Sequence, residues 1–452
     1  MVVPALTLNA STGIDIDALV RTLCELGRVE RLEELGAGGP LIASAGADSL
    51  FHCLFGRDAL RMALDLLEDF PAVAHATLVE LARLQGVRHH PRGEEEPGRI
   101  LHEHRFPDDP HGARLGQDWD FPYYGAVDTT PLWINLLVAY CQETASLAIL
   151  DEPITDRAWR HITLFDSLLV AVDWLLRRLE DPSGGGYLWV RRMSSNGIAN
   201  QVWEDSGDSY YHADGRLLDF TRAYAPVSVQ GLAYDALLGA ADLIERSATF
   251  GLSIDGHHLR ERAADLRTRT LAHFWQADLG TFAQALTFEP DGLQRPARVV
   301  ASSPGHLLAS RLLDGDDAAS LRDRLAARLM EPDLLACAGI RTKSTTAARF
   351  RAGAYHNGST WPWDTGVIAD GLRRHGYVAQ ADELDSRILT ACARVGGFPE
   401  FFRGDDRACA SVNSVTLDEI VDGVVNRVEQ PPQARQGWTV TRVWRILRSP
   451  RG

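Results

Sequence analysis

Helical periodicity is the feature of this 452-residue sequence that most restricts its fold. Apolar residues recur at intervals of three and four over long stretches, which places them on one face of a helix. Strand-like alternation of apolar and polar residues is scarce, so we predict an all-α chain. The predicted helices cover residues 14–35, 57–70, 74–84, 130–148, 158–180, 227–246, 257–275, 318–330, 363–375, 378–395 and 433–448, with a shorter one at 305–313.

A polar segment rich in aromatic residues precedes several of these helices. Such segments lie at residues 55–58, 123–128, 202–215, 355–364 and 397–405. A ring of paired helices would gather them at one end, around a single funnel, whereas a stacked solenoid would spread them over a long surface. We therefore predict a ring of helix pairs with long loops at one end.

The acidic composition argues against several classes of partner. The formal net charge is −15, from 46 basic and 61 acidic residues, which disfavours nucleic acid and anionic membranes as main partners. No uninterrupted apolar run reaches the roughly 18 residues that a membrane helix needs. Residues 1–12 lack the features of a secretory signal, and the six cysteines are scattered without a CxxC pair. We therefore expect a cytoplasmic protein without disulfides or bound metal.

Two acidic segments that lie far apart, 203–209 and 397–402, place carboxylates among aromatic side chains. Hydrolysis of a glycosidic bond needs such a pair, because one carboxylic acid protonates the leaving oxygen while a second carboxylate activates water or attacks the sugar. Aromatic faces also stack on sugar rings. The same residue types would serve a helix cap or a turn, since short oxygen side chains bind free backbone amides.

Four motifs, taken in their order along the chain, carry a resemblance to a known family. They are Phe55–Leu60 (FGRDAL), Val127–Leu132 (VDTTPL), Trp203–Ser209 (WEDSGDS) and Tyr355–Pro362 (YHNGSTWP). The chain resembles the amylo-alpha-1,6-glucosidase, or glycogen-debranching, family from about residue 50 to residue 445. The resemblance implies an (α/α)6 toroid that hydrolyses α-glucosidic bonds with inversion and needs no cofactor. We expect residues 1–50 to form an N-terminal extension packed on a catalytic domain of residues 51–452.

The resemblance also implies catalytic roles for individual residues. Asp205 matches the general acid of the family and Glu400 in Phe-Pro-Glu matches the general base, with Asp208 as the second candidate for the acid. Arg57 and Asp58 match the pair that holds the sugar, and charged groups at a helix start can bind adjacent hydroxyls strongly. A salt bridge with Asp58 favouring the helix N-terminus is the structural alternative.

Further candidates for substrate binding adjoin these motifs. Trp203 and Trp361 are candidate stacking surfaces, and His356 and Asn357 are candidates for hydroxyl recognition or for support of the site. Gln230 lies in a segment that enters a predicted inner helix. Each could instead pack in the core, since tryptophan is usually mostly buried. The histidine spacing around Glu103 and His104 lacks a third ligand motif, so no metal is expected there.

The sequence is compatible with several substrate specificities. The family's additional domains do not fit into the roughly 50 residues before Phe55, so a small oligosaccharide or glucoside is as credible a substrate as a branched α-glucan. We expect hydrolysis of an α-glucosidic bond, most simply α-1,6. The alternatives are a toroid hydrolase like trehalase or like glucosylglycerate or mannosylglycerate hydrolases, and a non-catalytic carbohydrate-binding protein. A basic pocket would indicate an anionic aglycone, and a wide aromatic groove would indicate a polymer.

Overall fold

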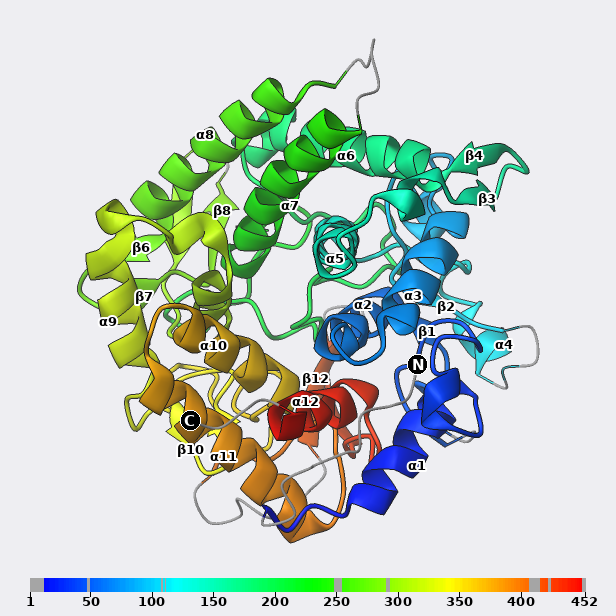
Figure 1. Ribbon diagram of the computed structural model, residues 1–452. Coiled ribbons are helices and arrows are strands. Elements are labelled where there is room, and N and C mark those ends of the chain that lie inside the picture. The colour runs from blue at the N-terminus through cyan, green and yellow to red at the C-terminus, as the bar shows by residue number, and fades with distance from the viewer. Residues whose placement is uncertain are drawn as a thin grey trace.

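Two concentric rings of helices make up the molecule (Figure 1), which is a computed structural model that describes residues 12–46, 49–106, 109, 111–247, 254–289, 293–405, 415–421 and 424–448. The inner ring consists of α2 (Gly56–Leu66), α5 (Thr129–Glu143), α7 (Val227–Arg246), the 3-10 helix η6 (Ser303–Ala309), α10 (Pro362–Arg374) and α12 (Gly437–Arg448). The outer ring consists of α1 (Ile16–Gly27), α3 (Pro71–Arg83), α6 (Leu164–Glu180), α8 (Gly256–Phe274), α9 (Ala319–Leu329) and α11 (Val378–Val395).

The inner ring is closed. Each of its six elements contacts the next along the chain, and α12 returns to contact α2. Each inner element also contacts an outer helix, as α7 contacts α8 and α10 contacts α11. The predicted all-α toroid is therefore confirmed.

Burial distinguishes the two rings. In α10, ten residues including Trp363 and Leu372 are buried, because an inner helix is covered by neighbours on most sides. By length and composition α7 could cross a membrane, yet 72% of its most apolar window is buried inside the ring, as expected of a core helix.

Helix α1 of the outer ring buries a single stripe that includes Leu19 and Leu23. It packs on α12 and joins the same hydrophobic core; a domain boundary at residue 50 stays a prediction.

Several predicted helices differ in the structure. Helix α1 ends at Gly27 and not at residue 35, because Arg28 adopts a left-handed conformation with a φ of 56° and ends the helix. Helix α5 ends at Glu143 and not at residue 148. Helix α6 begins at Leu164 and not at residue 158, because the preceding residues form the hairpin of β3 (Pro153–Thr155) and β4 (His161–Thr163). Thr163 then caps α6 in a capping box with Asp166. The segment 305–313 forms the 3-10 helices η6 and η7 (Arg311–Leu313) in place of an α-helix.

Strands are short, with one exception. The longest pair is the hairpin of β12 (Val415–Val421) and β13 (Val424–Gln430), which periodicity did not predict. Short hairpins are formed by β6 (Trp275–Gln276) with β7 (Thr281–Phe282) and by β10 (Leu335–Ala336) with β11 (Gly339–Ile340). Strand β1 (Leu54–Phe55) pairs antiparallel with the distant β2 (Glu103–His104). A three-stranded sheet contains β5 (Tyr224–Pro226), β8 (Ala285–Phe288) and β9 (Gln294–Ala297). Strands β1 and β5 run directly into the inner helices α2 and α7, so they help to fix the starts of these helices.

Close approach of α10 to η6 depends on a glycine. A Cβ atom on Gly371 would lie 2.6 Å from the backbone of Leu308. We expect Gly371→Ala to lower the free energy of unfolding by about 1–3 kcal/mol, because overpacking displaces one of two inner elements. Gly112→Ala is the control, since its Cβ would meet nothing closer than 3.8 Å. Denaturant unfolding measures both variants, and equal stabilities would contradict the close packing.

Candidate active site

A cavity of about 320 Å³ lies at the end of the ring where α2 and α12 begin. Four residues predicted from the sequence line it together: Arg57, Asp58, Asp205 and Glu400. They come from the start of α2, from the long loop before α7 and from the segment that follows α11. The chain therefore brings carboxylates from distant segments to one cavity.

Arg57 joins two inner helices to the loop that carries Asp205. Its Nε and Nη2 donate to the two carboxylate oxygens of Asp128, at 2.7 and 3.2 Å, and its Nη1 lies 3.5 Å from Oδ2 of Asp205. Asp128 is the residue immediately before α5. The preceding Gly56 permits this geometry, because a Cβ atom there would lie 2.2 Å from the carbonyl oxygen of Leu101. This close approach explains why the Phe-Gly-Arg-Asp motif has a glycine at residue 56.

The Asp205 carboxyl is largely shielded from solvent, and its side chain is 29% exposed. Burial raises the pKa of Asp205 to about 6, although the positive charge of Arg57 acts in the opposite direction. The negative charge of Asp128 adds to the rise. A carboxyl group with such a pKa holds a proton in an appreciable fraction of molecules near neutral pH, which is a property that a general acid needs.

Glu400 is held through both of its carboxylate oxygens. The Tyr355 hydroxyl donates to Oε1, and the backbone amide of Gln433 donates to Oε2 at 3.0 Å. Burial raises the pKa of Glu400 to about 8, while these two hydrogen bonds favour the ionised form and limit the rise. The side chain is therefore fixed in orientation and titrates near neutral pH.

Asp58 is the third carboxyl group of the cavity. It accepts a hydrogen bond of 3.0 Å from Nε2 of Gln436, and burial raises the pKa of Asp58 to about 7. The charges of Asp58 and Asp205 each raise the pKa of Glu400. The three groups thus titrate as a coupled cluster, and their apparent pKa values belong to the cluster as a whole.

The rest of the wall was not predicted in detail. It includes Phe51, Phe55, His102, Glu103, Arg105, Trp119, Ser206, Tyr355, Gln436 and Trp438. Four of these residues each keep one buried polar atom without a partner among the described residues, namely His102 Nδ1, Trp119 Nε1, Gln436 Oε1 and Trp438 Nε1. Buried polar atoms are normally hydrogen-bonded, so these four atoms are available to form hydrogen bonds with a ligand. The only sequence signal for Trp119 and Trp438 was their residue type.

Three residues expected to contact the sugar lie behind the wall. Trp203 and Trp361 are 4% and 1% exposed and meet edge to face at 5.9 Å, so they form an aromatic layer beneath the cavity. Gln230 is fully buried, and its amide group binds the backbone of Leu188 and Pro226. The expectation of direct contact is corrected for these three, because core packing and backbone hydrogen bonds occupy them.

His356, Asn357 and Asp208 also lie outside the wall. Burial lowers the pKa of His356. Its Nδ1 accepts from the backbone amide of Ser206 at 3.3 Å and lies 2.9 Å from the hydroxyl oxygen of the same residue, beside Asp205. Asn357 donates to the carbonyl oxygen of Asp208 at 3.1 Å. The carboxylate of Asp208 accepts from Ser206 at 3.2 Å and lies near two arginines. These residues support the loop of Asp205 without facing the cavity.

A buried ion pair anchors the same loop from behind. Lys343, the single lysine of the chain, pairs with Glu204 through Nζ and Oε1, and both side chains are fully buried. Gln284 donates to the other carboxylate oxygen of Glu204 at 3.4 Å and to the carbonyl oxygen of Ser209 at 2.9 Å. Glu204 directly precedes Asp205, so this pair helps to set the position of the Asp205 backbone.

We expect Lys343→Met to destabilise the protein by about 3–5 kcal/mol, because it leaves a buried carboxylate without its cation. The double variant Glu204→Gln/Lys343→Met should recover most of this loss, since no charge is then left alone. Chemical denaturation of the two single variants and the double variant measures the coupling energy. Additive losses in the double variant would contradict a direct interaction.

Comparison with known proteins was made for both sequence and fold. The family model of the mannosylglycerate hydrolase MGH1-like glycoside hydrolase domain matches residues 133–411, more than half of the chain. The GH63 mannosylglycerate hydrolase from Thermus thermophilus in complex with Tris and D-glycerate has a TM-score of 0.62 at 16% identity, covering 95% of this chain and 98% of that one. A glycosidase in complex with glucose has a TM-score of 0.55 at 15% identity, covering 95% of each chain. A search of curated protein sequences finds no significant match.

The comparisons support the expected toroid glycoside hydrolase but do not show the amylo-alpha-1,6-glucosidase family. At these identities the solved structures establish the toroid fold alone, whereas the family model identifies the sequence family. It does not support membership of the amylo-alpha-1,6-glucosidase family, although it agrees with a glycoside hydrolase of the toroid type. The chain belongs to the family of mannosylglycerate hydrolase MGH1-like glycoside hydrolases.

Proposed function

We propose that this protein hydrolyses a small α-glycoside of a hydroxy acid, such as an α-mannosyl or α-glucosyl glycerate, with inversion at the anomeric carbon. The observation that carries the proposal is a cavity whose wall contains both Asp205 and Glu400. Its volume of about 320 Å³ lies near the lower end of the roughly 300–1,000 Å³ usual for ligand pockets. A substrate of one sugar and a short aglycone suits such a space. The family of the chain supports this substrate class.

In the proposed mechanism Asp205 protonates the departing glycosidic oxygen. Glu400 takes a proton from a water molecule that attacks the anomeric carbon from the opposite face. Arg57 stabilises the Asp205 carboxylate that forms when the proton leaves, since its Nη1 is 3.5 Å from Oδ2. The Tyr355 hydroxyl keeps Glu400 oriented. Aromatic side chains of the wall, including Trp119 and Trp438, would shield the reaction from bulk water.

A neutral α-1,6-glucosidic disaccharide is the second candidate substrate, and the charge of the wall favours it. The wall contains four carboxyl groups, those of Asp58, Glu103, Asp205 and Glu400, and the two arginines Arg57 and Arg105. Both arginines already pair with carboxylates, since Arg57 binds Asp128 and Arg105 binds Glu103 and Asp109. An anionic aglycone would therefore compete with these internal partners for a cation.

The substrate class is tested by sugar release from mannosylglycerate, glucosylglycerate, isomaltose, panose and limit dextrin. We expect mannosylglycerate or glucosylglycerate to be hydrolysed with a higher kcat/KM than isomaltose, panose or limit dextrin, because a cavity of about 320 Å³ suits one sugar with a short aglycone. NMR at early times follows the released anomer and should detect the β form. A preference for limit dextrin, or release of the α anomer, would contradict the proposal.

The catalytic pair is tested by conservative substitution. We expect Asp205→Asn and Glu400→Gln each to reduce kcat by about 10²–10⁴-fold, because each removes a proton-transfer group without changing side-chain size. Asp208→Asn is the matched control, since its carboxylate lies outside the cavity wall, and a loss below about tenfold is expected. Steady-state kinetics with circular dichroism as a fold check decides between Asp205 and Asp208 as the acid. The larger loss in Asp208→Asn would assign the acid to that residue.

The raised pKa values predict the pH dependence of the reaction. The active form of the Asp205–Glu400 pair carries one proton. Asp205 holds this proton and acts as the acid, while the ionised Glu400 acts as the base. Burial raises the pKa of Asp205 to about 6 and that of Glu400 to about 8, so the singly protonated pair is most abundant between these values. Most of these protons lie on Glu400, and the active form with the proton on Asp205 is a smaller fraction that follows the same pH dependence. We expect kcat/KM to be bell-shaped with its maximum near neutral pH. A maximum below pH 5 would show that the cavity does not desolvate the pair.

A further inference from the structure

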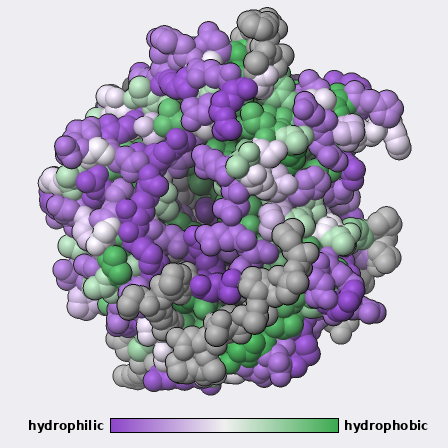
Figure 2. Space-filling view, viewed as in Figure 1, coloured by the Kyte–Doolittle hydropathy of each residue, from purple (hydrophilic) through white to green (hydrophobic). Residues whose placement is uncertain are grey.

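A second cavity, of about 390 Å³, lies toward the other end of the ring axis. Arg57 and Asp58 of the first cavity lie in the first turn of α2, whereas the second cavity is lined by Arg61 and Leu64 of that helix. Asn135 and Gln142 in the second half of α5, and Arg374 at the end of α10, complete much of its wall. A hollow rimmed mostly by hydrophilic residues is visible at the centre of the ring (Figure 2).

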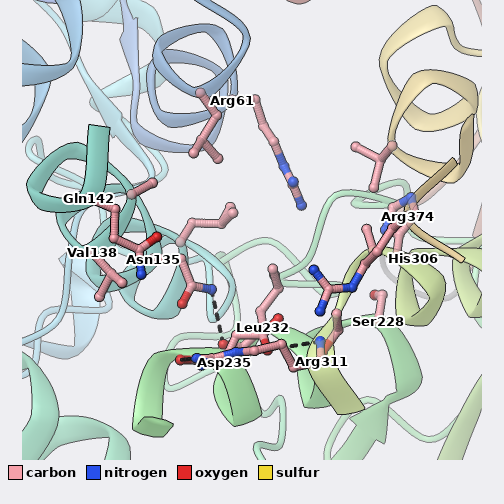
Figure 3. A pocket seen from close by; sticks show the side chains of 16 residues that line it. Arg61, Asn135, Val138, Gln142, Ser228, Leu232, Asp235, His306, Arg311 and Arg374 are labelled. Carbon is pink, nitrogen blue, oxygen red and sulfur yellow. Dashed lines mark hydrogen bonds and ion pairs between the residues drawn. The ribbon is translucent and has the colours of Figure 1, made fainter. Parts of the chain in front are cut away.

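The charge of this wall is opposite to that of the whole protein. Three arginines, Arg61, Arg311 and Arg374, face one aspartate, Asp235, in a chain with a formal net charge of −15. Arg311 lies 3.3 Å from Asp235, and Arg374 pairs with Asp314 at 2.7 Å. The arginine side chains reach into the space from different helices (Figure 3).

Arg61 is distinct among these cations. In the described part of the chain, no carboxylate lies within ion-pair distance of its guanidinium, and no acceptor takes a hydrogen bond from it. Its buried Nε also has no partner there. Burial lowers the pKa of Arg61 to about 10, so the group still carries its charge at neutral pH. Its Cζ lies 5.3 Å from the ring centre of Trp363, a contact that compensates only part of the lost hydration.

We propose that this second cavity binds a small organic oxyanion, a carboxylate or a phosphate, through the guanidinium of Arg61. An anion at this point would supply the charge and the hydrogen-bond acceptors that the arginine lacks. Arg374 and the amides of Asn135 and Gln142 offer further donors in the same wall. Leu64, Leu132 and Val367 supply apolar contacts for the carbon skeleton of the ligand.

The test measures the melting temperature and isothermal titration heats of the full chain in inorganic phosphate and in D-glycerate. Sodium chloride at equal ionic strength is the reference that removes screening effects. We expect one of the two oxyanions to raise the melting temperature in a saturable way, and the one that does identifies the ligand as phosphate or carboxylate. No saturable effect of either would overturn the proposal.

Two variants locate the binding. Arg61→Met should weaken anion binding by about tenfold or more and should raise the melting temperature in anion-free buffer, because it removes a half-buried cation that has no carboxylate partner among the described residues. Ala139→Leu fills the same cavity without changing charge and should also weaken binding. Arg31→Gln, on the exposed surface, is the matched control and should bind normally. Binding that survives both cavity variants would place the anion elsewhere and refute the assignment.

Discussion

The bidentate contact between Arg57 and Asp128 is the interaction on which the site depends most. It joins the start of α2 to the residue before α5, and the remaining Nη1 of the arginine then reaches Asp205 in a third segment. Arg57 and Asp128 are 3% and 5% exposed, so the interaction operates where water does not weaken it. Loss of either group would leave a buried charge alone, which is far more costly than loss of a surface pair.

Burial is the second constraint, because it links the closed ring to the chemistry. The carboxyl groups of Asp58, Asp205 and Glu400 each have a pKa raised first of all by burial. An open solenoid would expose such groups to water and leave them ionised at neutral pH. The layer formed by Trp203, Trp361 and their neighbours excludes water from below the cavity. The aromatic residues near the carboxylate motifs thus shape the cavity and limit its contact with water.

The two ends of the inner ring differ in charge although they share helices. Successive turns of α2 carry Arg57, which is neutralised by carboxylates in the first cavity, and Arg61, which has no such partner in the described residues of the second. Loops that precede the inner helices bring acidic residues to one end only. The toroid therefore holds two cavities of opposite charge, and successive turns of the same helix line them.

The sequence by itself determined the helical periodicity, the order of the polar segments and the residues Arg57, Asp58, Asp205 and Glu400, because these depend on local patterns and on short motifs. Tertiary structure decided which side chains face the cavity. Trp203 and Asp205 are two residues apart, yet only Asp205 lines the space, and Tyr355, Trp119 and Trp438 join it from remote segments. The direction of a side chain, and the pKa that burial imposes on it, depend on packing between segments hundreds of residues apart. A linear pattern does not contain that information.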